Sequence, residues 1–186
     1  MFFKFFNKDK PTFTYKYKNG KISKETWNKD GRIHRDNGPA VISYYENGNV
    51  KSKKWFKENK YHREDGPASI SYYENGDVKS EEWFVNNIYH REDGPAQISY
   101  YEYGIKIQEI WFKNGEFYRE DGPTIIDYYG NGAVYRKAWY YNDKGYHRKD
   151  GPALIFYYEN GNIASEQYFL NNKEILNELQ IELMKF

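Results

Sequence analysis

The chain repeats one pattern of apolar and polar positions about every 28 residues. In one copy, Ala96, Ile98 and Tyr100 take alternate positions with polar residues between them, which is the period-two pattern of a β-strand. Glu-Asn-Gly follows in most copies, and Asn and Gly tolerate the positive φ angles that a tight hairpin turn requires. A second strand-like segment then runs on through a Trp. Each copy therefore predicts one β-hairpin.

Three landmarks define the length and the number of copies. They are Trp27, Trp55, Trp83, Trp111 and Trp139, the Gly-Pro pairs that begin at Gly38, Gly66, Gly94, Gly122 and Gly151, and the Tyr-Tyr pairs that begin at Tyr44, Tyr72, Tyr100, Tyr128 and Tyr157. One residue inserted near Asp143 displaces the last copy, so Tyr168 takes the sixth Trp position. The repeat therefore runs about five and a half times.

Each copy offers three places where the chain could reverse: the Glu-Asn-Gly turn, a polar turn after the Trp, and the Asp-Gly-Pro corner. Three reversals would leave each copy antiparallel to the one before it, yet the landmarks recur in every copy. We therefore expect the corner to be a bend. The sequence predicts an all-β fold, an elongated single-sheet stack of tandem β-hairpins on the order of 50 Å long at roughly 4.8 Å per strand.

Both ends of the array differ from its middle. We divide a single repeat domain, 1–186, into an N-terminal cap at 1–14, repeats at 15–171 and a C-terminal cap at 172–186. Asn171 and Asn172 offer a helix N-cap, and Ile175, Leu176, Leu179 and Leu183 form an apolar stripe at helical spacing. The sequence therefore predicts a capping helix over 172–185. At the other end, the Phe-rich residues 2–6 and a strand over 12–18 would cover the first hairpin.

Composition narrows the classes of function. Aromatic residues make up 20% of the chain and the mean hydropathy is -1.06, which suits a thin sheet with partly exposed aromatic rings. The net charge of +1 gives no overall basic field for nucleic acid or an anionic membrane. No segment has the length and apolarity of a membrane span, and the absence of Cys fits a reducing compartment, so we expect a cytoplasmic protein.

A His-Arg-x-Asp group is the most regular candidate for chemistry. The residues are His34, His62, His90 and His147, then Arg35, Arg63, Arg91, Arg119 and Arg148, and then Asp65, Asp93, Asp121 and Asp150. An active site has no reason to be copied in every repeat, and Tyr118 replaces the His in one copy. We interpret the Arg and Asp residues as a structural brace of the corner. A stack of His residues that binds a metal is the alternative.

The Tyr-Tyr-Glu-Asn-Gly and Trp-Phe-x-Asn-Gly segments, with the Asp-Gly-Pro-Ala corner between them, resemble the MORN-variant repeats of bacteria, phages and large DNA viruses. These include antitoxin-like repeat proteins of bacterial toxin modules. The likeness covers about residues 15–171. It implies a stack of β-hairpins and a role in protein contact or toxin neutralisation, although the wider family includes lipid-associated members. The 28-residue period and the His-Arg-x-Asp-Gly-Pro connection depart from the common pattern.

The motif search points away from an enzyme. No phosphate-binding Gly-rich loop, Ser/His/Asp set or HExxH motif occurs, and we expect no cofactor and no catalytic residue. The Tyr and Trp residues could stack nucleic-acid bases or contact lipid headgroups, but cross-strand packing in a single sheet also accounts for them. The central charged positions of the second strands, Lys53, Glu81, Glu109, Lys137 and Glu166, are expected to form a solvated face.

Positions that break the repeat are the best candidates for contact with a specific partner. They are Tyr103, Ile105, Ile107, Ile110, Tyr135, Arg136 and Phe156, accompanied by Ala138 and Leu154. Together they have the composition of a protein interface, although packing or neutral drift could also explain them. The sequence therefore favours a non-enzymatic protein-binding scaffold. We expect a small inhibitor or immunity protein that acts on a toxin or a defence enzyme, for example an anti-CRISPR, with a nucleic-acid or lipid-headgroup binder as the alternative.

Overall fold

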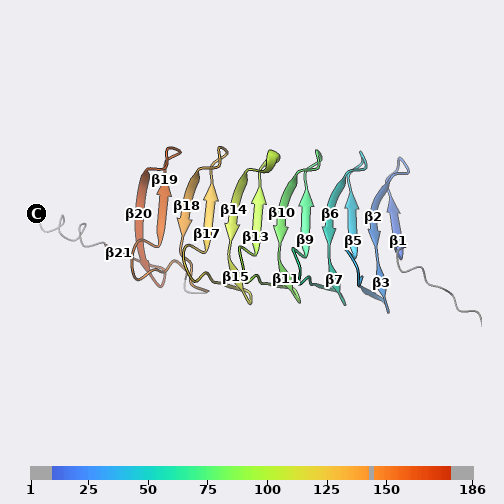
Figure 1. The fold of residues 1–186 in the computed structure, drawn as a ribbon, viewed down its shortest axis with the longest axis horizontal. Coiled ribbons are helices and arrows are strands. Elements are labelled where there is room, and N and C mark those ends of the chain that lie inside the picture. The colour runs from blue at the N-terminus through green and yellow to red at the C-terminus, as the bar shows by residue number, and fades with distance from the viewer. Residues whose placement is uncertain (1–9, 143–144, 177–186) are drawn as a thin grey trace, which may run out of the picture.

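In the computed structural model, the chain forms a row of β-hairpins that follow one another in sequence order (Figure 1). The structure describes residues 10–142 and 145–176. Within them lies one antiparallel sheet of 13 strands, each paired with the strand before and after it in the row. The strands run across the long axis of the molecule, so the row of hairpins is elongated, as the sequence predicts.

Except in the first hairpin, the first strands carry the Ala-x-Ile-x-Tyr pattern, with Thr124 in place of Ala in one copy. The second strands lead to the Trp, which Tyr168 replaces in the last copy. The first strands are β1 (Phe13–Lys16), β5 (Val41–Tyr44), β9 (Ser69–Tyr72), β13 (Gln97–Tyr100), β17 (Ile125–Tyr128) and β19 (Leu154–Tyr157). The second strands are β2 (Ile22–Thr26), β6 (Val50–Lys54), β10 (Val78–Glu82), β14 (Lys106–Ile110), β18 (Val134–Ala138) and β20 (Ile163–Leu170), and β21 (Lys173–Ile175) follows. A short 3-10 helix, η1 (Glu102–Gly104), forms the turn between β13 and β14.

Strand register divides the sheet into two faces with different side chains. On the isoleucine face, Ile42, Ile70, Ile98, Ile126 and Ile155 lie opposite the central charged residues of the second strands. On the serine face, Ser43, Ser52, Ser71, Ser80 and Ser99 pair in one row across the sheet. The fully buried apolar side chains of the described residues are all Ala, so the core is thin.

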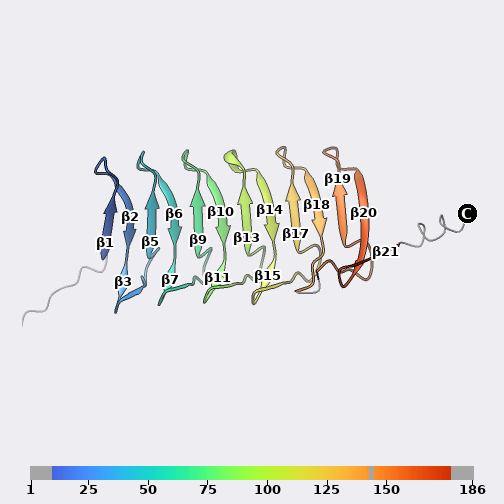
Figure 2. The ribbon, with the colours of Figure 1, turned by 180° about the vertical axis from the view of Figure 1, so that it is seen from behind.

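After each second strand the chain forms a small hairpin at the other margin of the sheet (Figures 1 and 2). These hairpins are β3 (Asn28–Lys29) with β4 (Arg32–Ile33), β7 (Phe56–Lys57) with β8 (Lys60–Tyr61), β11 (Phe84–Val85) with β12 (Ile88–Tyr89), and β15 (Phe112–Lys113) with β16 (Glu116–Phe117). Their tips need two successive positive φ angles, as at Asn86 (54°) and Asn87 (68°). In the copy with the inserted residue, a single bridge joins Tyr140 to Tyr146.

Rings of the small hairpins stack into a continuous aromatic ladder. Its members are Phe56, Tyr61, Phe84, Tyr89, Phe112, Phe117, Tyr140, Tyr146 and Phe169, with neighbouring ring centroids 4.2–5.4 Å apart. The ladder contacts the serine face at the end of the sheet next to the small hairpins. There, Tyr89 Oη donates to Glu82 Oε1 at 3.0 Å. It therefore links successive repeats along that margin through ring contacts.

The Asp-Gly-Pro corner is a bend, which confirms the parity prediction. Trp55 donates its N–H to the carbonyl of Ala68, which follows the corner, and accepts the N–H of His62, which precedes it. Both chain segments therefore run antiparallel to the strand that contains Trp55. With two reversals per repeat, each hairpin has the same orientation as the one before it.

The predicted capping helix over 172–185 is wrong at its beginning. Asn171 (φ 50°) and Asn172 (φ 61°) form a hairpin tip like Asn86 and Asn87, and β21 then pairs antiparallel with the end of β20. The sixth repeat thus continues into its own small hairpin, because two Asn residues in left-handed conformation favour a tight turn over a helix N-cap. Residues 177–185 of the predicted helix, and the Phe-rich residues 2–6, lie outside the described residues.

We expect that deletion of residues 68–95 leaves a folded, shorter array. The deletion joins Pro67 to Ala96, which matches Ala68 in sequence position and burial, so the bond from Trp55 N–H to the following Ala carbonyl can form again. Circular dichroism would check the β content and X-ray scattering the reduced length. Global unfolding of the shortened chain would show that the repeats are not interchangeable.

Candidate partner-binding site

Each repeat holds its corner with one arginine stacked on one tryptophan. The guanidinium carbon lies 3.9–4.2 Å from the Trp ring centroid at all five positions, Arg35, Arg63, Arg91, Arg119 and Arg148. Each Arg Nη1 also donates to the carbonyl of the corner Pro, at 3.2 Å from Arg91 to Pro95. The stack and the hydrogen bond together fix the direction in which the chain leaves the corner.

The aspartates of the group contribute less than the arginines. Asp65, Asp93 and Asp150 accept from Arg Nε at 2.8–3.1 Å, and this bond lowers the pKa of each carboxyl group. Their side chains are more than four-fifths exposed, so solvent screens these ion pairs. Asp121 makes no such bond with Arg119, although the structure describes both residues.

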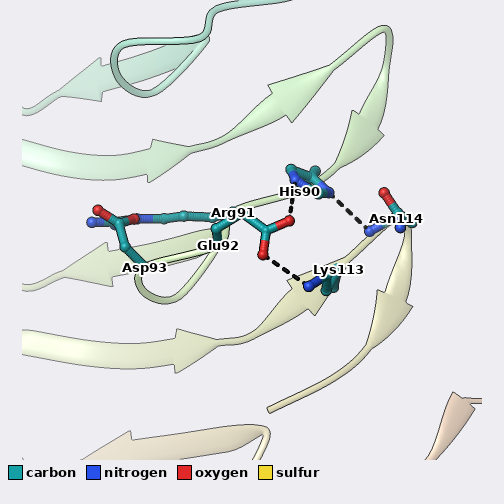
Figure 3. Close-up of polar contacts among 6 residues, drawn as sticks. All are labelled: His90, Arg91, Glu92, Asp93, Lys113 and Asn114. Carbon is teal, nitrogen blue, oxygen red and sulfur yellow. Dashed lines mark hydrogen bonds and ion pairs between the residues drawn. The ribbon is translucent and has the colours of Figure 1, made fainter. Parts of the chain in front are cut away.

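The histidines connect one repeat to the next (Figure 3). His90 Nδ1 accepts the backbone N–H of Asn114 at 3.2 Å, and His90 Nε2 lies 3.2 Å from Glu92 Oε1. Lys113 Nζ donates to the other oxygen of Glu92 at 2.8 Å, which lowers the pKa of that carboxyl group. Because Nδ1 accepts, the proton of the neutral ring lies on Nε2. Each ring nitrogen thus has a partner within the scaffold.

The same arrangement recurs at other copies. His34 and His147 accept the backbone N–H of Glu58 and Asn171 at 3.3 and 3.1 Å. Among residues 10–142 and 145–176, no group of three or more His, Cys, Asp or Glu side chains is placed to hold a metal ion. The side chains of His34, His90 and His147 therefore connect adjacent repeats, whereas His62 Nδ1 is buried without a hydrogen-bond partner and each corner Arg side chain binds within its own repeat.

The predicted solvated face of central charged residues is wrong at Glu109. Glu109 is 6% exposed, accepts a hydrogen bond from Tyr128 Oη, and pairs with Lys106 Nζ at 2.5 Å. Tyr44 Oη donates to Glu25 at 2.6 Å and Tyr100 Oη to Glu81 at 2.8 Å. These three Glu residues lie opposite the Ile row and are bonded to Tyr side chains. The other predicted positions, Lys53, Glu81, Lys137 and Glu166, are partly exposed.

The repeat-breaking residues separate into covered and exposed groups. Ile110, Ala138 and Leu154 lie on the serine face near the small hairpins, where Ala138 is fully buried and Leu154 is 6% exposed. Ile110 is partly buried and pairs with Ile125. These three residues pack within the array. Packing, and not contact with a partner, therefore accounts for their departure from the repeat.

Tyr135 and Phe156 belong to a group of exposed or partly exposed rings farther from the small hairpins, on the serine face. The Tyr135 ring contacts Tyr129 and Phe156 with centroids 5.1 and 5.6 Å apart. Tyr158 is 57% exposed and directly follows Tyr157, whose carbonyl accepts a hydrogen bond from Tyr129 Oη at 2.7 Å, so we include it in the same group. We name Tyr129, Tyr135, Phe156 and Tyr158 the aromatic patch. Lys51 and Lys79 occupy the position of Tyr135 in two earlier repeats.

Arg136 borders the aromatic patch and occupies a repeat position that is Ser in two earlier copies. Its Nε atom pairs with Asp127 Oδ2 at 2.5 Å, and Gln108 Nε2 donates to the other oxygen of Asp127 at 2.6 Å. From Ser43 to Ser99 this row consists of Ser residues, and Ser71 and Ser80 bond to each other at 2.6 Å. The guanidinium is therefore oriented by a partner of its own and still has donors that can bind another molecule.

Tyr103 lies apart from the aromatic patch, at the turn between β13 and β14. It has a φ of 70°, its side chain is 84% exposed, and its N–H donates to Asp77 Oδ2 at 2.9 Å. Ile105 and Ile107, which follow it, are partly buried. The seven candidates therefore do not form one surface. Sequence reasoning missed Tyr129, Tyr158 and Asp127, because the two tyrosines occupy regular repeat positions and Asp127 draws no attention among other polar residues.

No model of a known protein family matches the chain, and comparison with curated proteins finds no similar sequence. In the described part of the chain, no helix is long and apolar enough to cross a membrane. The candidate site therefore rests on the side chains described above.

Replacement of Arg91 by Ala is expected to lower the free energy of unfolding by about 1–3 kcal/mol, because the Trp83 ring and the Pro95 carbonyl both lose a partner. Asp93→Ala is expected to cost less than Arg91→Ala, because that carboxylate is mostly exposed and solvent screens its ion pair. Urea unfolding of both variants would check this order. An equal or larger loss in Asp93→Ala would contradict the proposed importance of the stack.

We expect the fold to lose stability at alkaline pH. Burial and the Glu25 carboxylate raise the pKa of Tyr44 to about 12, and burial with Glu82 does the same for Tyr89. The unfolded value is about 10, so folding favours the protonated tyrosines; this contribution is complete below about pH 10 and is lost as the pH rises through 12.

The measurement is tyrosinate absorbance together with circular dichroism across that pH range. Tyr44→Phe is the matched variant, since it keeps the ring and removes one of the titrating hydroxyls. Titration of every tyrosine near pH 10 in a protein that stays folded would contradict the expectation.

Proposed function

We propose that the chain is a non-enzymatic protein-binding scaffold whose partner contacts the aromatic patch and Arg136. The observation that carries this proposal is the replacement of Lys and Ser by Tyr135, Arg136 and Phe156 on the serine face. Aromatic residues and Arg are the types enriched at protein interfaces and their energetic hot spots. In the two repeats that contain Lys51 and Lys79, these positions are Lys or Ser, so the scaffold itself does not require the Tyr, Arg and Phe side chains.

The placement of the rings favours a protein partner over nucleic acid. Stacking of bases requires open ring faces along a basic groove. Here Arg guanidinium groups cover the Trp rings, neighbouring rings cover the members of the aromatic ladder, and the chain carries a net charge of +1. The aromatic patch is instead compact and bordered by an Arg–Asp pair, which suits a folded protein surface.

Within that class, we propose a small inhibitor or immunity protein that binds a toxin or a defence enzyme. The resemblance to MORN-variant repeats of toxin modules supports this role. The brace also supports it, since the corner arginines and three of the four histidines are hydrogen-bonded within the scaffold, as Arg91 and His90 are. Such a protein acts by covering a surface of its target and needs no chemistry of its own.

Reversion of the aromatic patch to the residues of earlier repeats is expected to abolish most binding without unfolding. Tyr135→Lys copies Lys51 and Lys79, and Phe156→Ser copies the serine row, so both variants retain side chains that this scaffold already accepts. Each is expected to weaken binding by about 1–3 kcal/mol. The partner would be recovered with the full chain from its native host, and affinity and melting temperature measured for every variant.

Lys51→Ala and Lys79→Ala are the controls, because they alter the same position in two regular repeats. Stronger effects from the controls than from Tyr135→Lys would place the site elsewhere. Recovery of nucleic acid in place of protein, with an affinity that falls steeply as salt rises, would establish the alternative function.

A further inference from the structure

A pocket of about 520 Å³ opens beneath the turn that carries Tyr103, on the isoleucine face of the sheet and thus on the opposite side from the aromatic patch. It is lined by Asp77, Val78, Glu81, Tyr100, Tyr103 and Gly104. Two carboxylates and two tyrosine rings thus surround one space, and the most exposed ring, Tyr103, stands at its margin. The pocket lies on β10 and the β13–β14 turn, away from the aromatic patch.

Other repeats show what such a position accepts. Lys53 Nζ lies 5.8 Å from the ring centroid of Tyr72, and Lys137 Nζ lies 5.2 Å from that of Tyr157. Tyr72 and Tyr157 hold the repeat position of Tyr100, and the two lysines hold that of Glu81. An ammonium group of the chain itself therefore occupies the space over this tyrosine in two repeats.

In the repeat after the pocket, the equivalent carboxylate has a cation of its own. Lys106 Nζ pairs with Glu109 at 2.5 Å. Within the described residues, Glu81 accepts from Tyr100 Oη and forms no ion pair, and Asp77 accepts only from Asn75 and from the Tyr103 N–H. Arg91, which acts on Tyr100 electrostatically, is held by Trp83, Asp93 and Pro95.

Sequence comparison between repeats shows that this combination occurs at one junction. The position of Asp77 is Lys21, Asn49, Ile105, Ala133 or Asn162 elsewhere, and the position of Tyr103 is Asn in every other copy. Two carboxylates and an additional aromatic ring meet only between β10 and η1. The scaffold does not need this arrangement to form its turns.

We propose that this pocket binds the cationic side chain of a lysine or arginine from another protein. The Asp77 and Glu81 carboxylates supply the charge, and the Tyr100 and Tyr103 rings supply faces for cation–π contact. The site is separate from the aromatic patch, so it does not depend on the function proposed above.

The test uses the full chain and four small probes: N-acetyl-arginine amide, N-acetyl-lysine amide, and their neutral counterparts N-acetyl-citrulline amide and N-acetyl-norleucine amide. Heteronuclear NMR follows the backbone amides of Asp77, Glu81, Tyr103 and Gly104. At least one cationic probe is expected to shift these signals with millimolar affinity, and its neutral counterpart to bind at least about tenfold more weakly.

Variants built from the other repeats separate binding from folding. Glu81→Lys copies Lys53 and is expected to abolish binding of the probe, whereas Tyr103→Asn copies the regular turn and is expected to weaken it several-fold. Tyr135→Lys alters the aromatic patch alone and is expected to leave probe binding unchanged. Equal binding of the neutral probes, retention of binding in Glu81→Lys, or no shift at the highest soluble probe concentration would overturn the proposal.

Discussion

The architecture depends on one interaction in each repeat, the packing of an Arg guanidinium group at the Asp-Gly-Pro corner. The group lies on a Trp ring, donates to the corner Pro carbonyl, and rests against the corner Gly so closely that a Cβ on Gly66 would lie 2.8 Å from the Arg63 guanidinium carbon. Trp, Arg and Gly are therefore fixed together, since loss of Trp or Arg leaves the other without its partner and a side chain on Gly would collide with the guanidinium group, while Pro contributes its backbone carbonyl. This requirement explains why Trp, Arg and Gly recur together at five corners while the strand surfaces vary.

Because the corner is fixed by side chains of its own repeat, the sheet surfaces are free to differ from copy to copy. The serine face changes from Ser and Lys in β5–β10 to Tyr135, Arg136 and Phe156 further along, and the isoleucine face combines acids and tyrosines at one junction. The array thus separates the residues that determine the fold from the surfaces that we propose for recognition. Two candidate surfaces on opposite faces can change without disturbing the brace or each other.

The periodicity of the sequence was sufficient to predict the hairpins, their stacking and the bend at the corner, because these depend on local turn chemistry and on regular alternation. Burial was less predictable, since it depends on neighbouring repeats: Leu154 and Phe156 share a strand face, yet the former is buried and the latter is only partly so. The sequence predicts that Glu109 faces solvent because the residue is charged. Its hydrogen-bond partner, Tyr128, lies nineteen residues away and cannot be identified from the sequence. Asn171 and Asn172 form a hairpin tip where the sequence predicts a helix N-cap, because both structures use the same residue types.

The orientation of the strands also determines how the molecule would carry mechanical load. Strands lie across the long axis, so the backbone hydrogen bonds between hairpins run along it (Figure 1). A force applied to the two ends would break these hydrogen bonds pair by pair, whereas a shear geometry would load many of them at once. The tensile strength of the whole array is therefore that of its weakest junction, and lengthening the array adds surface for binding without adding resistance to force.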